Sequence, residues 1–319
     1  MTEDFEIIVG TYEQFLLGYK VIKEEKKYRL ERSFATKDHV ASIRTTSSMK
    51  HYLASGAADD CINIYDMKRR TESGKLMHHN GTVNCVSFTP DATHLVSCSS
   101  DGSIAVVRCG NWQLEKHWTS AHKNSEVNTL AIHPTGKCTL SVGTDGVLRL
   151  WNLVNGHHAY AINLVPRLKL QAKNITVLQW SPDGEKYLMA ANNQLDVYSR
   201  STAGICAEVT FDVKIVCVEF INDNVIVIGH ENGTLRIYDI EEQSELLQTV
   251  GHDSRVKCLK HKGKFIVSAS SSGEVKVWKY EDIPRNVRLF GFLGVPFIVL
   301  WVVYLSIQYM NIEINIRQV

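Results

Sequence analysis

Residues 140–153 read LSVGTDGVLRLWNL and contain the unit around which the chain is organised. Two short runs of alternating apolar residues flank Asp145-Gly146, a dipeptide typical of a tight hairpin turn because glycine readily adopts positive φ. The second run is rich in residues that favour a strand, and Trp151 adds a large apolar surface that needs burial. The stretch therefore predicts a β-hairpin that packs within a larger all-β fold.

The same hairpin recurs along the chain. Related stretches occupy residues 53–66, 95–108, 187–199, 226–239 and 265–279. The position of the tryptophan is taken in turn by Tyr65, Val107, Trp151, Tyr198, Tyr238 and Trp278. This spacing, about 40–47 residues, is typical of WD repeats, in which each unit supplies one four-stranded propeller blade. The repeat predicts six units that end near residues 66, 108, 152, 199, 239 and 279.

In four of the units, a histidine lies about 26–29 residues before the position of the tryptophan. In WD repeats this histidine, a serine on the next strand, the aspartate of the turn and the tryptophan form a hydrogen-bonded structural network. The residues expected to form it here are His39, Ser55, Asp59, Tyr65, His79, Ser97, Asp101, His122, Ser141, Asp145, Trp151, His252, Ser268 and Trp278. Val107 has lost the indole, and Ser272 stands where aspartate is expected. The fourth and fifth units carry Asn192 and Asn232 at the turn and no clear histidine, so we expect these two blades to be looser.

The N-terminal residues 6–36 precede the first histidine and are expected to form strands of a partial blade that lacks its innermost strand. Propellers commonly close by combining strands from both termini in one blade, which leaves no unpaired edge. The missing strand should therefore come from the chain after Lys279. The sequence predicts an all-β, seven-bladed WD-repeat propeller over residues 1–280, followed by an atypical hydrophobic segment at 281–319.

That segment contains residues 289–312, LFGFLGVPFIVLWVVYLSIQYMNI, which carry no charged side chain. As a helix it would extend about 36 Å, enough to cross a membrane core of about 30 Å. Arg285 and Arg288 lie just before it, on the side expected to stay cytoplasmic, whereas Pro296 would bend such a helix and Trp301 falls near its middle. Three alternatives stay open: a C-terminal apolar, transmembrane helix that anchors the protein, closing strands of the last blade with an apolar tail, or an alternative C-terminus.

The composition points away from several classes of function. The chain has 35 basic and 34 acidic residues and a formal net charge of +1, so it lacks the charge excess of a general nucleic-acid binder. Its eight cysteines form no CxxC pair, which favours reduced, buried thiols. No HExxH, GxSxG or GxxxxGK[ST] motif occurs. We therefore expect a protein that is not an enzyme and that has no catalytic residue, metal site or cofactor.

A binding protein needs a surface, and in propellers the loops that lead into the innermost strands form one rim of the central channel. Loop residues on a rigid scaffold are free to contact partners. The candidate partner-binding residues on this rim are Lys37, Asp38, Asn80, Lys123, Asn124, Glu126, Asp253, Ser254 and Arg255. Arg255 is the first to test, since arginine is favoured at interface hot spots. The basic run at residues 68–70 is interpreted as a solvated loop.

Several stretches resemble one family of WD-repeat proteins, the p21-activated kinase-interacting proteins and their ribosome-assembly relatives. They are VGTYEQFLLGYKV, INIYDMKRR followed by HHNGTVNCVSF, HPTGKCTLSVGTDGVLRLWNLVNG, and LQWSPDGEKY. The resemblance covers about residues 7–280. It implies a seven-bladed propeller without enzymatic activity, a nucleolar role in maturation of the large (60S) ribosomal subunit, and negative regulation of p21-activated kinases through their regulatory region.

The chain departs from this family at its end. Members of the family continue with more propeller sequence and a long lysine-rich tail, where this chain has its apolar segment. The basic tail would be the source of nucleolar retention and RNA affinity, so direct RNA contact stays open here. Loss of the usual closing strand is expected to leave the strands at residues 6–21 with an exposed edge.

Three functional hypotheses follow. The first is a non-catalytic scaffold of the nucleus and nucleolus that docks pre-60S assembly factors on the rim. The second is a kinase regulator whose rim occupies the regulatory region of a p21-activated kinase. The third is a membrane-anchored WD-repeat adaptor that faces the cytoplasm and uses residues 289–312 as its anchor.

Overall fold

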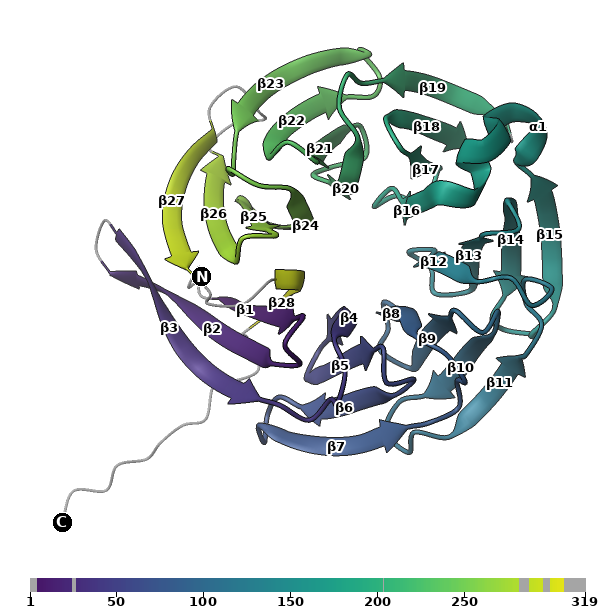
Figure 1. The fold of residues 1–319 in the computed structure, drawn as a ribbon, viewed down its shortest axis with the longest axis horizontal. Helices are drawn as coiled ribbons and strands as arrows, with labels where there is room; N and C mark the ends of the chain where they lie inside the picture. The colour runs from purple at the N-terminus through teal and green to yellow at the C-terminus, as the bar shows by residue number, and fades with distance from the viewer. Residues whose placement is uncertain (1–4, 25–26, 203, 281–286, 295–298, 307–319) are drawn as a thin grey trace.

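Seven four-stranded antiparallel sheets are arranged radially around a central channel in the computed structural model (Figure 1). It describes residues 5–24, 27–202, 204–280, 287–294 and 299–306. The arrangement confirms the expected seven-bladed, all-β propeller.

Six blades follow the chain in order, each from its innermost to its outermost strand. The first blade contains β4 (Ile43–Met49), β5 (Tyr52–Ala57), β6 (Ile62–Asp66) and β7 (Thr71–Leu76). The second contains β8 (Val83–Phe88), β9 (His94–Ser99), β10 (Ile104–Arg108) and β11 (Leu114–Trp118). The third contains β12 (Val127–Ile132), β13 (Cys138–Gly143), β14 (Val147–Asn152) and β15 (His158–Asn163).

The other three blades repeat this order. The fourth contains β16 (Ile175–Trp180), β17 (Lys186–Ala191), β18 (Gln194–Ser199) and β19 (Ile205–Thr210). The fifth contains β20 (Ile215–Phe220), β21 (Val225–His230), β22 (Thr234–Asp239) and β23 (Ser244–Val250). The sixth contains β24 (Val256–Lys262), β25 (Phe265–Ser270), β26 (Glu274–Tyr280) and β27 (Val287–Gly294).

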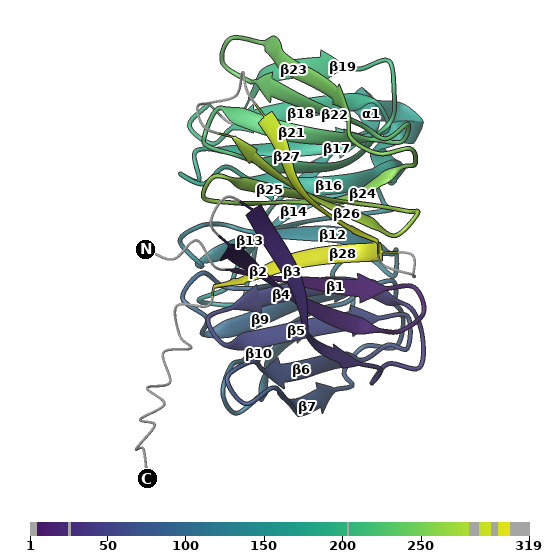
Figure 2. The same cartoon turned by 90° about the vertical axis from the view of Figure 1, so that its left-hand side faces the viewer.

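The closing blade joins both ends of the chain, in the order β28 (Val299–Ser306), β1 (Phe5–Thr11), β2 (Leu16–Glu24) and β3 (Lys27–Thr36). Its innermost strand, β28, is antiparallel to β1, with Phe5 opposite Ser306 and Gly10 opposite Trp301. Figure 2 shows the two strands side by side at the seam of the ring. The expectation that the missing strand comes from beyond Lys279 is confirmed.

The expected C-terminal transmembrane helix at residues 289–312 is wrong. Within this stretch β27 pairs with β26 and β28 pairs with β1, so the structure favours the alternative of closing strands. The physical reason is that the free edge of β1 offers backbone hydrogen bonds that a separate helix would leave unused. The expected exposed edge at residues 6–21 is wrong for the same reason. None of the helices in the described ranges is both long and apolar enough to cross a membrane, and residues 307–312 lie outside those ranges.

The core lies between neighbouring blades. The second strand of a blade is buried along nearly all its length, as in β5 and β21, whereas the outer strand β15 is largely exposed. Because both faces of each sheet are covered by other blades, the second strands are buried along both faces instead of alternating between buried and exposed residues. Ile62 and Ile64 of one blade pack against Val83 and Val86 of the next.

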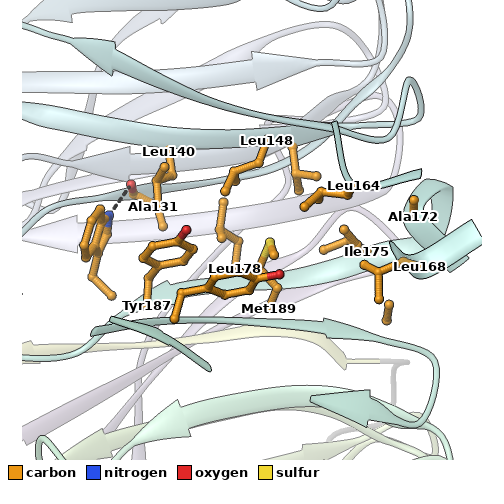
Figure 3. Close-up of a cluster of buried hydrophobic side chains, with 14 residues drawn as sticks. Ala131, Leu140, Leu148, Leu164, Leu168, Ala172, Ile175, Leu178, Tyr187 and Met189 are labelled. Atoms are coloured by element: carbon orange, nitrogen blue, oxygen red, sulfur yellow. Dashed lines mark hydrogen bonds between the residues drawn. The ribbon is translucent and has the colours of Figure 1, made fainter. Parts of the chain in front are cut away.

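A short helical insertion precedes the fourth blade. It contains α1 (Val165–Leu168) and the 3₁₀ helix η1 (Lys169–Asn174). Figure 3 shows Leu168 and Ala172 from this insertion beside Leu164 and Ile175, at one end of a buried cluster that extends to Leu148 and Tyr187 of the third and fourth blades. The insertion therefore buries apolar surface at one end of an inter-blade core.

The innermost strands share an irregularity near their start. In six blades the register shifts by one residue after the first position of this strand. A β-bulge of this kind leaves one extra residue that is not paired across the ladder. The residues at these six bulges are Arg44, Asn84, Asn128, Thr176, Val216 and Lys257.

Candidate functional site

The third blade contains a continuous hydrogen-bonded chain of four side chains. Trp151 Nε1 donates to Ser141 Oγ over 2.9 Å, and Ser141 Oγ lies 2.8 Å from His122 Nε2. On the other side of the ring, His122 Nδ1 lies 3.0 Å from Asp145 Oδ1. Arg149 Nη1 also donates to Asp145 at 2.6 Å. The same Arg149 nitrogen lies 2.7 Å from His122 Nδ1, so this ring nitrogen faces both the carboxylate of Asp145 and the guanidinium of Arg149.

The electrostatics of this chain favour a neutral histidine and a charged aspartate. Burial lowers the pKa of His122, although Asp145 acts to raise it. Burial by itself would raise the pKa of Asp145, but hydrogen bonds from His122 and Arg149 outweigh it and lower that pKa to about 2. The network therefore keeps one fixed protonation pattern near neutral pH.

The connectivity of Ser141, His122 and Asp145 is that of a serine-hydrolase triad. The side chains of Ser141 and His122 are nevertheless fully buried, at 0% exposure each. Ser141 Oγ also accepts a hydrogen bond from the indole N–H of Trp151. The geometry suits a structural brace between the blade's strands and its loops.

The first blade has a related network with a tyrosine. His39 Nε2 lies 2.8 Å from Ser55 Oγ, and His39 Nδ1 lies 3.0 Å from Asp59 Oδ2. The hydroxyl of Tyr65 donates to Asp38 on the preceding loop at 3.1 Å. Burial raises the pKa of Tyr65 to about 12, so this hydroxyl remains a donor.

The sixth blade replaces the missing turn aspartate with a glutamate from the next strand. His252 Nε2 lies 2.7 Å from Ser268 Oγ, to which Trp278 Nε1 donates at 2.8 Å. His252 Nδ1 lies 2.9 Å from Glu274 Oε2. Glu274 thus supplies the carboxylate that faces His252 Nδ1, in place of the turn aspartate that Ser272 replaces.

The second blade fills the place of the indole with histidines. His79 Nε2 lies 2.8 Å from Ser97 Oγ, and His78 Nε2 lies 3.2 Å from the same oxygen. His78 is therefore placed to donate where a tryptophan would, because Val107 cannot. His117 packs beside them, with ring centroids 6.0 Å from His78 and 6.1 Å from His79. Burial and then the two neighbouring imidazoles lower the pKa of His78 to about 4.

The turn aspartate of the second blade is held by several donors. Asp101 Oδ2 accepts the backbone N–H of Asn80 at 2.7 Å and lies 3.8 Å from His79 Nδ1. Burial would raise the pKa of Asp101, but the hydrogen bonds it accepts, including that from Ser103, lower it well below its usual range. The carboxylate therefore ties the loop before β8 to the hairpin of its own blade.

The fourth and fifth blades use other contacts. Tyr187 and Tyr198 stack with ring centroids 5.0 Å apart, and Arg167 of the helical insertion pairs with Asp196 at 3.1 Å. In the fifth blade, Asn232 Oδ1 accepts hydrogen bonds from the backbone N–H and the hydroxyl of Thr234, at 3.1 and 2.7 Å. The greater looseness expected of these two blades stays a prediction.

All nine predicted rim residues lie on loops that lead into innermost strands, at one face of the ring, here called the rim face. They are Lys37 and Asp38 before β4, Asn80 before β8, Lys123, Asn124 and Glu126 before β12, and Asp253, Ser254 and Arg255 before β24. The His–Asp contacts place the β5–β6 and β13–β14 hairpins at this same face. The opposite face carries the turns that follow the innermost strands, such as residues 133–137.

Some of these side chains hold their own loops together. Asp38 accepts the hydroxyl of Tyr65, and Glu126 accepts the side-chain amide of Asn84 at 3.0 Å. Ser254 Oγ accepts a backbone N–H of the neighbouring hairpin at 3.1 Å. Substituting these three residues would therefore disturb the loops themselves as well as any contact with a partner.

Other rim residues project into solvent. Lys123 and Asn124 are exposed and both have left-handed backbones, with φ of 49° and 63°. Lys123 and Asp253 make no side-chain hydrogen bond or ion pair within the described ranges. Arg255 Nη2 lies 3.5 Å from Glu231, and both groups are almost half exposed. These are the rim side chains most available to a partner.

Comparison with known proteins agrees with this geometry. The WD domain, G-beta repeat family matches residues 70–107, 113–152 and 244–279. The chain is 36% identical to the p21-activated protein kinase-interacting protein 1-like of Danio rerio, over 88% of this chain and 74% of that protein. It is 35% identical to the p21-activated protein kinase-interacting protein 1 of Homo sapiens, over 87% of this chain and 71% of that one. The chain belongs to the p21-activated kinase-interacting protein 1 family.

A more distant relative of this family member is the Shk1 kinase-binding protein 15 of Schizosaccharomyces pombe, which is 25% identical over 88% of this chain and 82% of its own length. None of these three names is that of an enzyme. The match confirms the resemblance that the sequence motifs indicated.

The possible sites for ligands of other kinds are few in this family member. No group of three or more His, Cys, Asp or Glu residues in the described ranges could hold a metal ion. All eight cysteines lie in the described ranges; Cys61, Cys98 and Cys258 are buried, and Cys206 is exposed.

Sequence reasoning missed several residues of the networks. Glu274 lies two residues beyond the expected aspartate position, and an acidic residue so close to the turn was the available signal. His78 is next to His79 in the sequence. The valine at position 107, where other repeats have an aromatic residue, was the available signal that another side chain would contact Ser97. No pattern in the sequence distinguished Arg149, whose role depends on the fold of its hairpin.

Proposed function

We propose that this chain is a non-catalytic scaffold that binds proteins on its rim face. One partner is the regulatory region of a p21-activated kinase, whose activity it lowers. The others are pre-60S assembly factors in the maturation of the large ribosomal subunit. The observation that carries the proposal is family membership, which rests on a similarity that covers 88% of the chain.

The kinase role is supported by the names of two kinds of relatives. One group is named as interacting with a p21-activated kinase, and the other as binding the kinase Shk1. The rim face supplies exposed side chains of both charges, including Lys123, Asp253 and Arg255. Since the side chains of the Ser141 network are buried, a stoichiometric binding role fits this propeller better than a catalytic one.

The ribosomal role rests on the ribosome-assembly relatives that the sequence motifs resemble, and it implies residence in the nucleolus. A propeller suits such work because it presents many loops on one rigid body. The membrane-anchored adaptor is not proposed, since the stretch on which it depended supplies β27 and β28.

The kinase role is tested by adding the purified chain to a p21-activated kinase and measuring autophosphorylation. We expect inhibition by the wild-type chain, weaker inhibition by Lys123→Glu and Arg255→Glu, and full inhibition by Lys137→Glu. Lys137 is exposed on the turn between β12 and β13, at the opposite face, and serves as the matched control. Unchanged autophosphorylation with the wild-type chain would refute this role.

The ribosomal role is tested separately by sedimentation of cell extracts. Co-sedimentation of the chain with pre-60S particles, retained in high salt, is expected. Its recovery only in the free-protein fractions at low salt would contradict the proposal.

A further inference from the structure

Two cations flank the innermost strand of the closing blade where the channel opens at the rim face. Arg44 and Lys257 are the bulge residues of β4 and β24, and these strands lie on either side of β28. Lys257 lines the central channel, which has a volume of about 670 Å³. Arg255 lies on the loop that leads directly into the same strand, so three positive side chains gather at this part of the mouth.

At the equivalent bulge positions of two other blades, the side chain donates a hydrogen bond to the next blade. Asn84 Nδ2 donates to the backbone oxygen of Val127 at 2.8 Å, and Asn128 Nδ2 donates to that of Ile175 at 3.1 Å. The side chains of Arg44 and Lys257 make no hydrogen bond or ion pair with any residue that the structure describes. The bulge residues Asn84 and Asn128 therefore link neighbouring blades by hydrogen bonds. The bulge residues Arg44 and Lys257 instead present charged side chains without a hydrogen-bond partner among the residues that the structure describes.

The charge around Lys257 is not neutralised by its surroundings. Burial, followed by the charges of Arg255 and Arg44, lowers the pKa of Lys257. The carboxylate that acts to raise this pKa, that of Glu231, lies 3.5 Å from Arg255 and so already faces a cation. A half-buried ammonium without a counter-charge is unfavourable, and an incoming anion would relieve that cost.

We propose that Arg44, Lys257 and Arg255 form an anion site that holds carboxylates of an acidic peptide segment inserted into the channel mouth. The inference rests on the proposed scaffold function, because it names the chemistry of the segment that the scaffold takes from a partner. Neighbouring arginine and lysine side chains suit a carboxylate, to which each can donate charge-assisted hydrogen bonds.

The surroundings favour a peptide over a single-stranded nucleic acid. Sequence-independent binding of single strands uses aromatic side chains on which bases stack. The six bulge residues at the mouth include no aromatic ring. The chain as a whole has a formal net charge of +1, without the basic excess typical of nucleic-acid-binding domains.

The test measures fluorescence anisotropy of a labelled hexaglutamate peptide with the full chain, and a labelled hexaglutamine peptide serves as the neutral control. The variants are Arg44→Gln, Lys257→Gln and the matched control Lys137→Gln on the opposite face. Circular dichroism and thermal unfolding of each variant show whether it is folded. A labelled single-stranded RNA hexanucleotide is measured in parallel, and the kinase assay above is run with the same proteins.

We expect hexaglutamate to bind at least about tenfold more tightly than hexaglutamine. Arg44→Gln and Lys257→Gln should each weaken it by about tenfold, and Lys137→Gln by less than twofold. Equal binding of the two peptides, or equal effects of Lys257→Gln and Lys137→Gln, would overturn the inference. Tighter binding of the RNA with the same dependence on Arg44 and Lys257 would overturn it in favour of a nucleic-acid site. Kinase inhibition without hexaglutamate binding would defeat only the anion site, whereas hexaglutamate binding without kinase inhibition would defeat only the kinase role.

Discussion

Replacing Arg70 with alanine should lower the free energy of unfolding of this propeller by about 3 kcal/mol. Arg70 lies between β6 and β7 of the first blade, and its guanidinium binds Glu6 on β1 of the closing blade through two nitrogens, at 2.6 and 2.9 Å. Ser33 of β3 also donates to Glu6. The ion pair therefore ties the closing blade to the first blade, and the expectation of a solvated loop at residues 68–70 does not hold for Arg70.

The magnitude follows from burial. The side chain of Glu6 is 1% exposed and that of Arg70 is 24% exposed. Removing one partner of a buried ion pair typically costs about 3–5 kcal/mol, because the remaining charge is left buried without compensation. We take the lower end because Ser33 still donates to Glu6 and the arginine is partly open to water.

The assay is equilibrium unfolding in urea, followed by tryptophan fluorescence, with Arg69→Ala as the matched control. Arg69 is 82% exposed and lies 3.9 Å from Asp66, so its loss should change stability by less than about 0.5 kcal/mol. Glu6→Gln and the double variant complete a cycle that isolates the pairwise energy. A cost for Arg70→Ala no greater than that for Arg69→Ala, or a coupling energy near zero, would refute the reasoning.

Three further outcomes are expected. Ser141→Ala should destabilise the chain by about 3 kcal/mol in thermal unfolding, because it leaves the buried Trp151 N–H without its acceptor and His122 Nε2 without its hydrogen-bond partner; a loss below about 1 kcal/mol would contradict this. The pKa of His78 is lowered to about 4 in the folded chain, so as the pH falls the unfolded chain takes up a proton at His78 before the folded chain does. The free energy of unfolding should therefore fall as the pH drops from about 6.5 to about 4. His78→Gln should flatten that part of the pH profile measured by urea unfolding, and an unchanged slope would count against it. A thiol reagent should modify Cys206 in the native protein within minutes and Cys98 only after unfolding, as mass spectrometry would show, since Cys98 is buried.

The second blade shows how a repeat tolerates the loss of its largest side chain. Val107 leaves Ser97 without an indole donor, and His78 lies within 3.2 Å of the same oxygen. With valine at the tryptophan position, the partner of Ser97 is an imidazole instead of an indole. The protonation of this network therefore depends on pH, because imidazole titrates and indole does not. The pH dependence predicted for His78 is therefore a consequence of the residue at position 107.

The sequence by itself determined the number and order of the repeats. Each blade is built from hairpins whose strands are neighbours in the chain, so turn residues such as Asp145-Gly146 and the alternating runs beside them carry the pattern locally. The His, Ser and Trp positions of the third blade could be read in the same way, because their spacing repeats with the hairpin.

Only the tertiary structure decided how the chain ends. Residues 289–312 are apolar enough for a membrane helix, and composition cannot distinguish this from strands that are buried on both faces. The decision depended on the edge of β1, which lies almost the whole length of the sequence away and pairs with β28. The roles of Glu274, His78 and the cations at the channel mouth have the same origin. They depend on side chains from separate strands meeting at one place, and a one-dimensional spacing does not record those distances.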